Sequence, residues 1–211
     1  MKLKDDVAFK SAKELADRIR QKDFSCRDLL ELYISRIERF NPTLNCVVTT
    51  NFDDARAQAD LADSEVSVGK TLGPLHGLPI TVKDALETAG IQSTGGAREL
   101  LGNIPERDAP VVKAVKDAGA IVMAKTNLPR WSGDLQTFND IFGTTNNPWD
   151  IDRVPGGSSG GAAAAVAAGL TAFEIGTDIG GSIRYPSSFC GVFGHKPSFG
   201  IVPSRGYLDH E

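Results

Sequence analysis

Two glycine-rich segments, each built around a serine, constrain this chain more than any other feature of its sequence. Residues 154–161 (VPGGSSGG) surround Ser158, and residues 178–184 (DIGGSIR) surround Ser182. Glycine reaches backbone conformations closed to other residues and lets N–H groups approach a reacting carbonyl closely. An alanine-rich run with high helix propensity, residues 162–168, follows the first segment directly. Both serines are therefore expected on tight turns that adjoin regular elements.

The remaining pattern alternates between helices and short strands. Serine caps at Ser11 and Ser25 begin two helical patterns, and Asn41-Pro42 is expected to stop the second. Further helices are expected at 53–63 and 109–118, and strands at 46–50, 80–83, 120–124 and 172–175. This order predicts an α/β fold with a mixed, largely parallel twisted sheet flanked by helices. We expect one domain, in which a helical segment (1–71) packs on a core (72–211).

Composition excludes several classes of function. The formal net charge is −4 and the basic residues are scattered, which argues against a nucleic-acid-binding surface. The most apolar small-residue run, 162–170, is far shorter than the roughly 20 residues of a membrane span. No signal peptide is visible at the start, so a cytoplasmic location is expected. Three cysteines and three histidines form no disulfide or metal pattern, and we expect no metal or cofactor.

Lys83 ends the short apolar strand at 80–83 and has two interpretations. If the side chain is buried beside Ile80 and Val82, its pKa falls and the neutral amine becomes a base. If it lies at the surface beside Asp84, it is an ordinary solvated lysine, as most lysines are. Residue type alone leaves both open.

The serines also admit alternatives. Gly156–Gly160 matches the G-x-S-x-G pattern of a nucleophile elbow, with His195 as the base for Ser158. An elbow follows a strand, however, and residues 149–155 have no strand pattern. A flexible linker or a phosphate cradle are weaker alternatives, since no complete phosphate-binding motif is present. Around Ser182, the glycines form either an oxyanion-holding turn or a plain tight turn. Ser67 and Lys70 match S-x-x-K, but we interpret them as loop.

Taken together, these segments resemble the amidase signature family of serine hydrolases, which includes bacterial amidases and fatty acid amide hydrolase. Besides the two serine segments, the matching runs are 77–84 (GLPITVKD), 124–127 (AKTN), 146–150 (NNPWD), 189–192 (FCGV) and 196–198 (KPS). The resemblance covers about residues 72–206.

The resemblance implies a catalytic role for three residues. Ser182 is the nucleophile, Ser158 the bridging serine and Lys83 the general base. Ser158, not Ser159, precedes Ser182 by the family's spacing of 24 residues. In the family, the bridging serine also follows a cis peptide bond. The implied oxyanion hole consists of the backbone N–H groups of Ile179, Gly180, Gly181 and Ser182. An Asp178–Arg184 pair that braces this loop is a hypothesis, with a solvated arginine as the alternative.

The expected function is therefore hydrolysis of a linear carboxylic amide to an acid and ammonia or an amine, through an acyl-enzyme. Chains of the family are much longer than this one, so the chain is interpreted as an N-terminal portion. The alternatives are a non-catalytic fragment, a component of a larger amidase or tRNA amidotransferase assembly, and an esterase that uses Ser158. The expected partners are a small-molecule amide and either another copy of the chain or the missing C-terminal part.

Overall fold

A four-stranded sheet forms the centre of the molecule. The computed structural model describes residues 3–208. The strand order is β1-β3-β2-β6; β2 runs parallel to β3 and β6, and β1 runs antiparallel to β3. The strands are β1 (Val47–Thr50), β2 (Pro79–Lys83), β3 (Ile121–Thr126) and β6 (Glu174–Ile175), and β4 (Phe138–Asn139) with β5 (Gly143–Thr144) forms a separate small pair. The mixed, largely parallel α/β sheet predicted from the sequence is confirmed.

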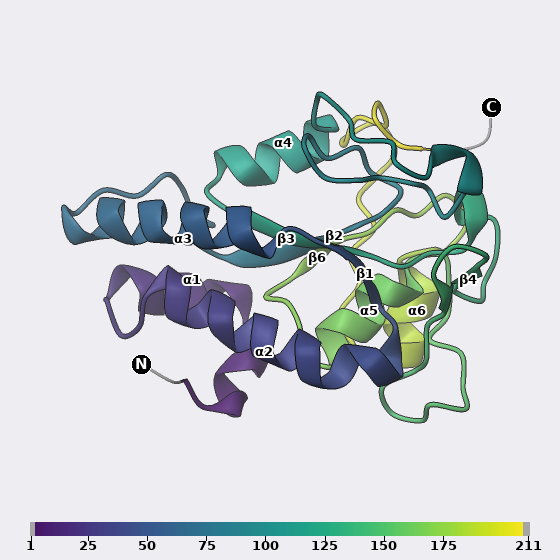
Figure 1. Cartoon of the computed structure of the whole chain (residues 1–211), viewed down its shortest axis with the longest axis horizontal. Coiled ribbons are helices and arrows are strands. Elements are labelled where there is room, and N and C mark those ends of the chain that lie inside the picture. The colour runs from purple at the N-terminus through teal and green to yellow at the C-terminus, as the bar shows by residue number, and fades with distance from the viewer. Residues whose placement is uncertain (1–2, 209–211) are drawn as a thin grey trace.

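Helices cover both faces of this sheet (Figure 1). In that view α4 lies above the sheet, while α2, α5 and α6 lie below it. The α-helices are α1 (Ala12–Arg20), α2 (Cys26–Leu44), α3 (Phe52–Ser67), α4 (Pro110–Asp117), α5 (Gly160–Ala167) and α6 (Arg184–Cys190). Short 3-10 turns occur at η1 (Asp5–Phe9), η2 (Arg98–Leu100) and η3 (Arg130–Ser132).

Serine caps begin the first two α-helices, as expected. The Ser11 side chain accepts a hydrogen bond from the Glu14 N–H. Ser25 and Asp28 form a reciprocal capping box, in which each side chain accepts the other residue's backbone N–H. These bonds satisfy donors that the first helical turn leaves without a partner.

The end of α2 differs from the expectation that Asn41-Pro42 stops the helix. Pro42 lies inside the helix, which continues to Leu44 and ends at Asn45 in a left-handed conformation (φ 49°). The Asn41 side chain accepts the N–H groups of Cys46 and Val47 and donates to the Val47 carbonyl, so it organises the turn beyond the helix end. Ser67 is likewise the last residue of α3 and not loop.

Two hydrophobic cores lie against the sheet. The larger one joins η1 and α1–α3 to Leu78, Met123 and the α5 residues Ala164 and Ala165. The smaller one includes Ile80 and Val82 of β2 together with residues of α4. Residues 3–71 thus contribute both a strand of the sheet and most of the larger core.

Helix α5 is short and made only of small residues and one valine. Its glycines permit close contact: a Cβ at Gly161 would lie 2.5 Å from the backbone N and O of Asn127. This packing holds the N-terminal end of α5 against the residue that follows β3. Within residues 3–208, no helix combines the length and apolar character needed to cross a membrane.

Candidate active site

Lys83 lies at the end of β2 and is completely buried (0% exposed). Its amine donates hydrogen bonds of 2.7 Å to Ser158 Oγ and 2.7 Å to Thr177 Oγ1. The alternative of a solvated surface lysine is therefore wrong. The strand carries the side chain inward because β2 is a central strand, covered on both faces.

Burial changes the protonation of this lysine. Loss of hydration lowers the pKa of Lys83 to about 7, because an ammonium ion is poorly solvated inside the protein. The negative charges of Glu174 and Asp178 act in the opposite direction and favour the ammonium form. A lysine with such a pKa is partly neutral near pH 7, and only the neutral amine can accept a proton.

Ser158 and Ser159 point to different partners. Ser158 is buried against Lys83, and the Gly157–Ser158 peptide bond is cis. Ser159 instead binds Thr177: its hydroxyl donates to the Thr177 carbonyl (3.1 Å) and accepts the Thr177 N–H (3.3 Å). Residues 149–155 contain turns and no strand, as the sequence predicted. Lys83 is thus hydrogen-bonded to Ser158 and not to Ser159.

Ser182 lies on the loop between β6 and α6. Its carbonyl accepts the Ser159 N–H at 3.1 Å, so the two serine segments are tied together through their backbones. Among residues 3–208, the Ser182 hydroxyl has no hydrogen-bond partner, and the structure contains no hydrogen bond between Ser158 and Ser182. The geometry therefore brings Lys83 and Ser158 into direct contact and leaves the Ser182 hydroxyl unengaged.

Asp178 fixes the shape of this loop. Its carboxylate accepts the N–H groups of Gly181 (2.8 Å) and Ile183 (3.1 Å). It also forms a two-pronged ion pair with Arg184, with distances of 3.0 and 2.9 Å, and this pairing holds the pKa of Asp178 far below its usual range. The hypothesised Asp178–Arg184 pair is confirmed.

The loop also presents free backbone donors. Within the described chain, the N–H groups of Ile179, Gly180 and Ser182 donate to no acceptor, whereas that of Gly181 is engaged by Asp178. Ile179 and Gly180 are exposed, and no atom lies within 4 Å of a Cβ built on Gly180. Three of the four expected oxyanion donors are therefore available, next to open space.

Sequence reasoning missed Thr177. This residue follows β6 and holds both partners, since its hydroxyl accepts from Lys83 and its backbone binds Ser159. A threonine before Asp178 has no distinguishing spacing of its own. Only the parallel pairing of β6 with β2 places it beside a lysine 94 positions earlier.

A second lysine, in the 124–127 motif, is also completely buried. Lys125 of β3 donates to the Leu86 carbonyl (2.5 Å) and to the hydroxyls of Thr88 (2.9 Å) and Ser93 (2.8 Å). Burial lowers the pKa of Lys125 to about 8 and raises that of the neighbouring Asp84 to about 6. These contacts anchor the loop that follows β2. Within residues 3–208, no group of three or more His, Cys, Asp or Glu side chains could hold a metal ion.

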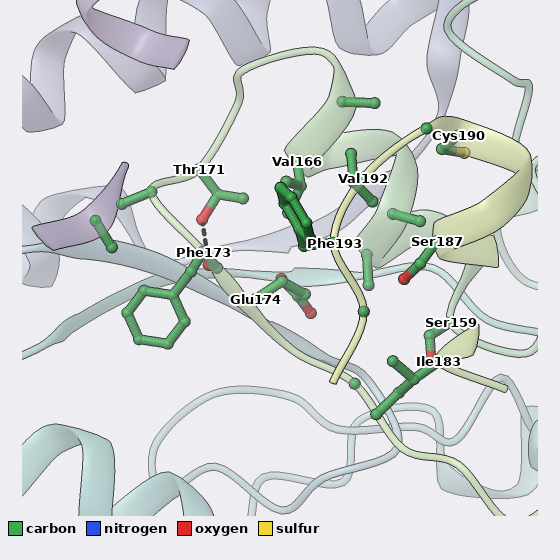
Figure 2. Close-up of a pocket in the computed structure, with 18 of the residues that line it drawn as sticks. Ser159, Val166, Thr171, Phe173, Glu174, Ile183, Ser187, Cys190, Val192 and Phe193 are labelled. Carbon is green, nitrogen blue, oxygen red and sulfur yellow. Dashed lines mark hydrogen bonds between the residues drawn. The ribbon is translucent and has the colours of Figure 1, made fainter. Parts of the chain in front are cut away.

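A cavity of about 770 Å³ lies beside the serine segments (Figure 2). Ser159, Glu174, Ile183 and residues of α5 line it, while Lys83, Ser158 and Ser182 do not. His195 is one of the residues that line this cavity and is exposed, and the structure contains no hydrogen bond between it and Ser158. The nucleophile-elbow alternative required His195 to contact the Ser158 hydroxyl, but that hydroxyl accepts a hydrogen bond from Lys83 instead.

Comparison with known protein families decides the classification. The model of the family described as Amidase matches residues 28–211. The chain belongs to the amidase family. This confirms the resemblance inferred from the sequence motifs. Among curated amidase-family relatives, the A subunit of the glutamyl-tRNA(Gln) amidotransferase of Heliobacterium modesticaldum is 43% identical over 199 residues, which is 94% of this chain and 41% of that protein.

Solved structures of amidase-family enzymes show the same fold. Fatty acid amide hydrolase superposes with a TM-score of 0.94 at 29% identity, over 99% of this chain and 37% of that one. The peptide amidase from Stenotrophomonas maltophilia gives 0.87 at 36% identity, over 93% and 42%. The chain thus spans about two fifths of the length of its curated relatives and structural neighbours.

Proposed function

We propose that this chain carries the catalytic residues of an amidase that cleaves a carboxylic amide through a Ser182 acyl-enzyme. The observation that supports this most strongly is the contact of 2.7 Å between the buried Lys83 amine and Ser158 Oγ. A lysine whose pKa lies near 7, and which is held beside a serine, has the properties required of a general base.

In the proposed first step, neutral Lys83 accepts the Ser158 hydroxyl proton while Ser158 accepts the Ser182 proton. Ser182 Oγ then forms a bond to the amide carbonyl carbon, and the carbonyl oxygen becomes an oxyanion. The unengaged Ser182 hydroxyl must move within hydrogen-bond distance of Ser158 for this transfer. Catalytic hydrogen bonds commonly tighten only when substrate is bound.

The free N–H groups of Ile179, Gly180 and Ser182 are assigned to hold the oxyanion, while Gly181 and Asp178 fix the loop. Loss of one such donor typically costs about 3–4 kcal/mol of barrier. When the intermediate collapses, the relay returns the proton to the leaving nitrogen, so that ammonia or a neutral amine departs. Water then attacks the acyl carbon, the acid is released, and the proton that water loses regenerates Ser182.

The proposed partners are a small-molecule amide and further polypeptide that covers the open side of the molecule. Strand β6 has only two residues and forms an edge of the sheet, which can accept a further strand. Phe193 and Phe199 are fully exposed, and the cavity beside β6 is lined largely by apolar residues. A second copy of the chain or a C-terminal continuation would bury these groups.

Membership of a tRNA amidotransferase assembly is a second candidate. It is favoured by eight curated relatives at 40–43% identity, each named as the A subunit of a glutamyl-tRNA(Gln) amidotransferase. In that case glutamine would be the amide that the site hydrolyses, and the ammonia would pass to a second site on another polypeptide of the assembly.

An amide panel tests these proposals. The purified chain would be incubated with glutamine, a simple aliphatic amide, an anilide and the matching esters, and release of ammonia, amine or acid would be measured. Turnover of aliphatic amides or anilides supports an amidase, and turnover of glutamine alone supports the amidotransferase candidate. Ester turnover that survives in Ser182→Ala would favour the esterase, and no turnover by a folded chain would favour a non-catalytic fragment.

The Thr177→Val variant addresses how Lys83 is positioned. Valine keeps the shape of threonine but removes the hydroxyl that accepts from Lys83 Nζ. Because one such hydrogen bond contributes about 1–3 kcal/mol, we expect kcat to fall by roughly 10- to 100-fold. Thr177→Ser keeps the hydroxyl and should restore most of the rate. Equal rates for the valine and serine variants would contradict this role.

A further inference from the structure

Glu174 lies on the same face of the sheet as Lys83. In β2, Thr81 and Lys83 are two residues apart, so their side chains project to one face. Thr126 of β3 pairs with Lys83, and Glu174 of β6 pairs with Thr81. Lys125 projects to the opposite face, where it binds the loop after β2.

The Glu174 carboxylate is held by two strands. Thr126 Oγ1 donates to Glu174 Oε1 at 2.8 Å, and Thr81 Oγ1 donates to Glu174 Oε2. Both oxygens therefore accept a hydroxyl, an arrangement that favours the ionised form. Figure 2 shows Glu174 on its strand, at the wall of the cavity.

Several other charged or titratable groups surround Glu174. Lys83 and Lys125 favour its ionised form. Burial raises the pKa of the Cys46 thiol, and the negative charge of Glu174 adds to that effect. Asp178 lies on the loop after β6 and, like Glu174, favours the ammonium form of Lys83. Helix α5, which packs on this face, contributes no titratable side chain. The remaining titratable residues that line the cavity are Lys10, Cys190 and His195.

We propose that Glu174 is a positioning residue whose carboxylate, fixed by Thr81 and Thr126, sets how tightly Lys83 holds its proton. Burial alone favours the neutral amine, and a negative charge on the same face of the sheet opposes that effect. Glu174 thus keeps Lys83 able both to accept a proton and to return it to a leaving amine. Its importance for catalysis rests on the proposed function, in which Lys83 is the base.

The pKa values agree with such coupling. Loss of hydration raises the pKa of Glu174 to about 8 and outweighs the hydroxyl donors and the lysines, while loss of hydration lowers the pKa of Lys83 to about 7. Glu174 is therefore ionised in only part of the molecules at pH 7, and its effect on Lys83 grows as the pH rises. The two groups therefore titrate over the same range, and the protons belong to the pair. Of the two charged groups that raise the pKa of Lys83, Glu174 has a larger effect than Asp178.

Glu174→Gln tests the proposal, because glutamine keeps the shape and removes the charge. The ε-carbon NMR signal of Lys83 in the full chain, assigned by its loss in Lys83→Met, would be titrated with pH. We expect the Lys83 midpoint to fall by about one pH unit, a tenfold loss of proton affinity. The acidic limb of the pH profile for labelling by a fluorophosphonate should move down equally. Glu38→Gln, which removes an exposed glutamate of α2, is the matched control and should move neither.

An unchanged Lys83 midpoint in folded Glu174→Gln would overturn the proposal and leave Glu174 a purely structural role. If that variant does not fold, Thr126→Val replaces it, since it removes one donor to the carboxylate and should lower the midpoint in the same direction. An unchanged midpoint there has the same meaning. The NMR titration does not require an active enzyme. A chain that the fluorophosphonate never labels would therefore count against the proposed function, while the Lys83 midpoint would still decide the role of Glu174.

Discussion

Replacing Ser182 with alanine is expected to lower kcat for amide hydrolysis by on the order of 10⁴-fold or more, while the fold is retained. Alanine removes the only atom that the mechanism bonds to the acyl carbon, and loss of a serine nucleophile has effects of this size or larger in other hydrolases. The Ser182 hydroxyl makes no hydrogen bond within residues 3–208, so its removal breaks no hydrogen bond of the side chain. Steady-state kinetics and a thermal melt of both proteins measure the two effects.

Ser188→Ala is the matched control for this experiment. Ser188 is an exposed serine of α6, six residues after Ser182, and it should be replaceable with no loss of rate.

Ser158→Ala is expected to lower kcat as well, because it interrupts the relay to Lys83. Full activity of Ser182→Ala would remove this serine from the mechanism.

Lys83→Met is expected to abolish turnover while changing stability in a way that depends on pH. Lowering the pKa of a lysine from 10.5 to about 7 corresponds to on the order of 5 kcal/mol of unfavourable free energy below pH 7. Methionine removes that cost. It also takes a donor from Ser158 and from Thr177, which costs about 1–3 kcal/mol for each partner left unsatisfied. The two effects oppose each other at pH 7, so the pH dependence is the diagnostic measurement.

The sign of that dependence follows from proton binding. Between pH 7 and 10.5 the unfolded chain holds a proton on Lys83 that the folded chain has released, so this residue makes stability rise with pH across that window. In Lys83→Met this contribution is missing. We therefore expect the free energy of unfolding of the wild type, measured by urea denaturation, to increase relative to that of the variant between pH 7 and pH 10. Lys70→Met, which replaces an exposed lysine, should run parallel to the wild type. A parallel curve for Lys83→Met would contradict a buried neutral amine.

Local sequence patterns predicted the elements that local interactions determine. The capping box at Ser25 and the turn residues around β2 need only neighbours in the chain. The predicted end of α2 at Asn41-Pro42 was wrong. The Asn41 side chain accepts the backbone N–H groups of Cys46 and Val47 beyond the helix end, and helix propensities of single residues do not include such a contact. The pair β4–β5 was missed because strands of two residues carry no periodicity.

The candidate site divides in the same way. The serines stand out because glycines flank them, but residue type could not decide whether Lys83 was buried. That depends on the strands on both sides of β2, which come from distant parts of the chain. Thr177 and Glu174 were missed for the same reason, since their partners Lys83 and Thr81 lie more than 90 positions earlier. Parallel pairing brings such residues together without any spacing visible in the sequence.

Peptide mapping after reaction with a fluorophosphonate tests the central claim most directly, because this reagent reacts preferentially with an activated serine and forms a stable bond to it. The account predicts one adduct, on Ser182, with a labelling rate that falls steeply in Lys83→Met. An adduct on Ser158, or labelling of Ser182 that proceeds at the wild-type rate without Lys83, would contradict it.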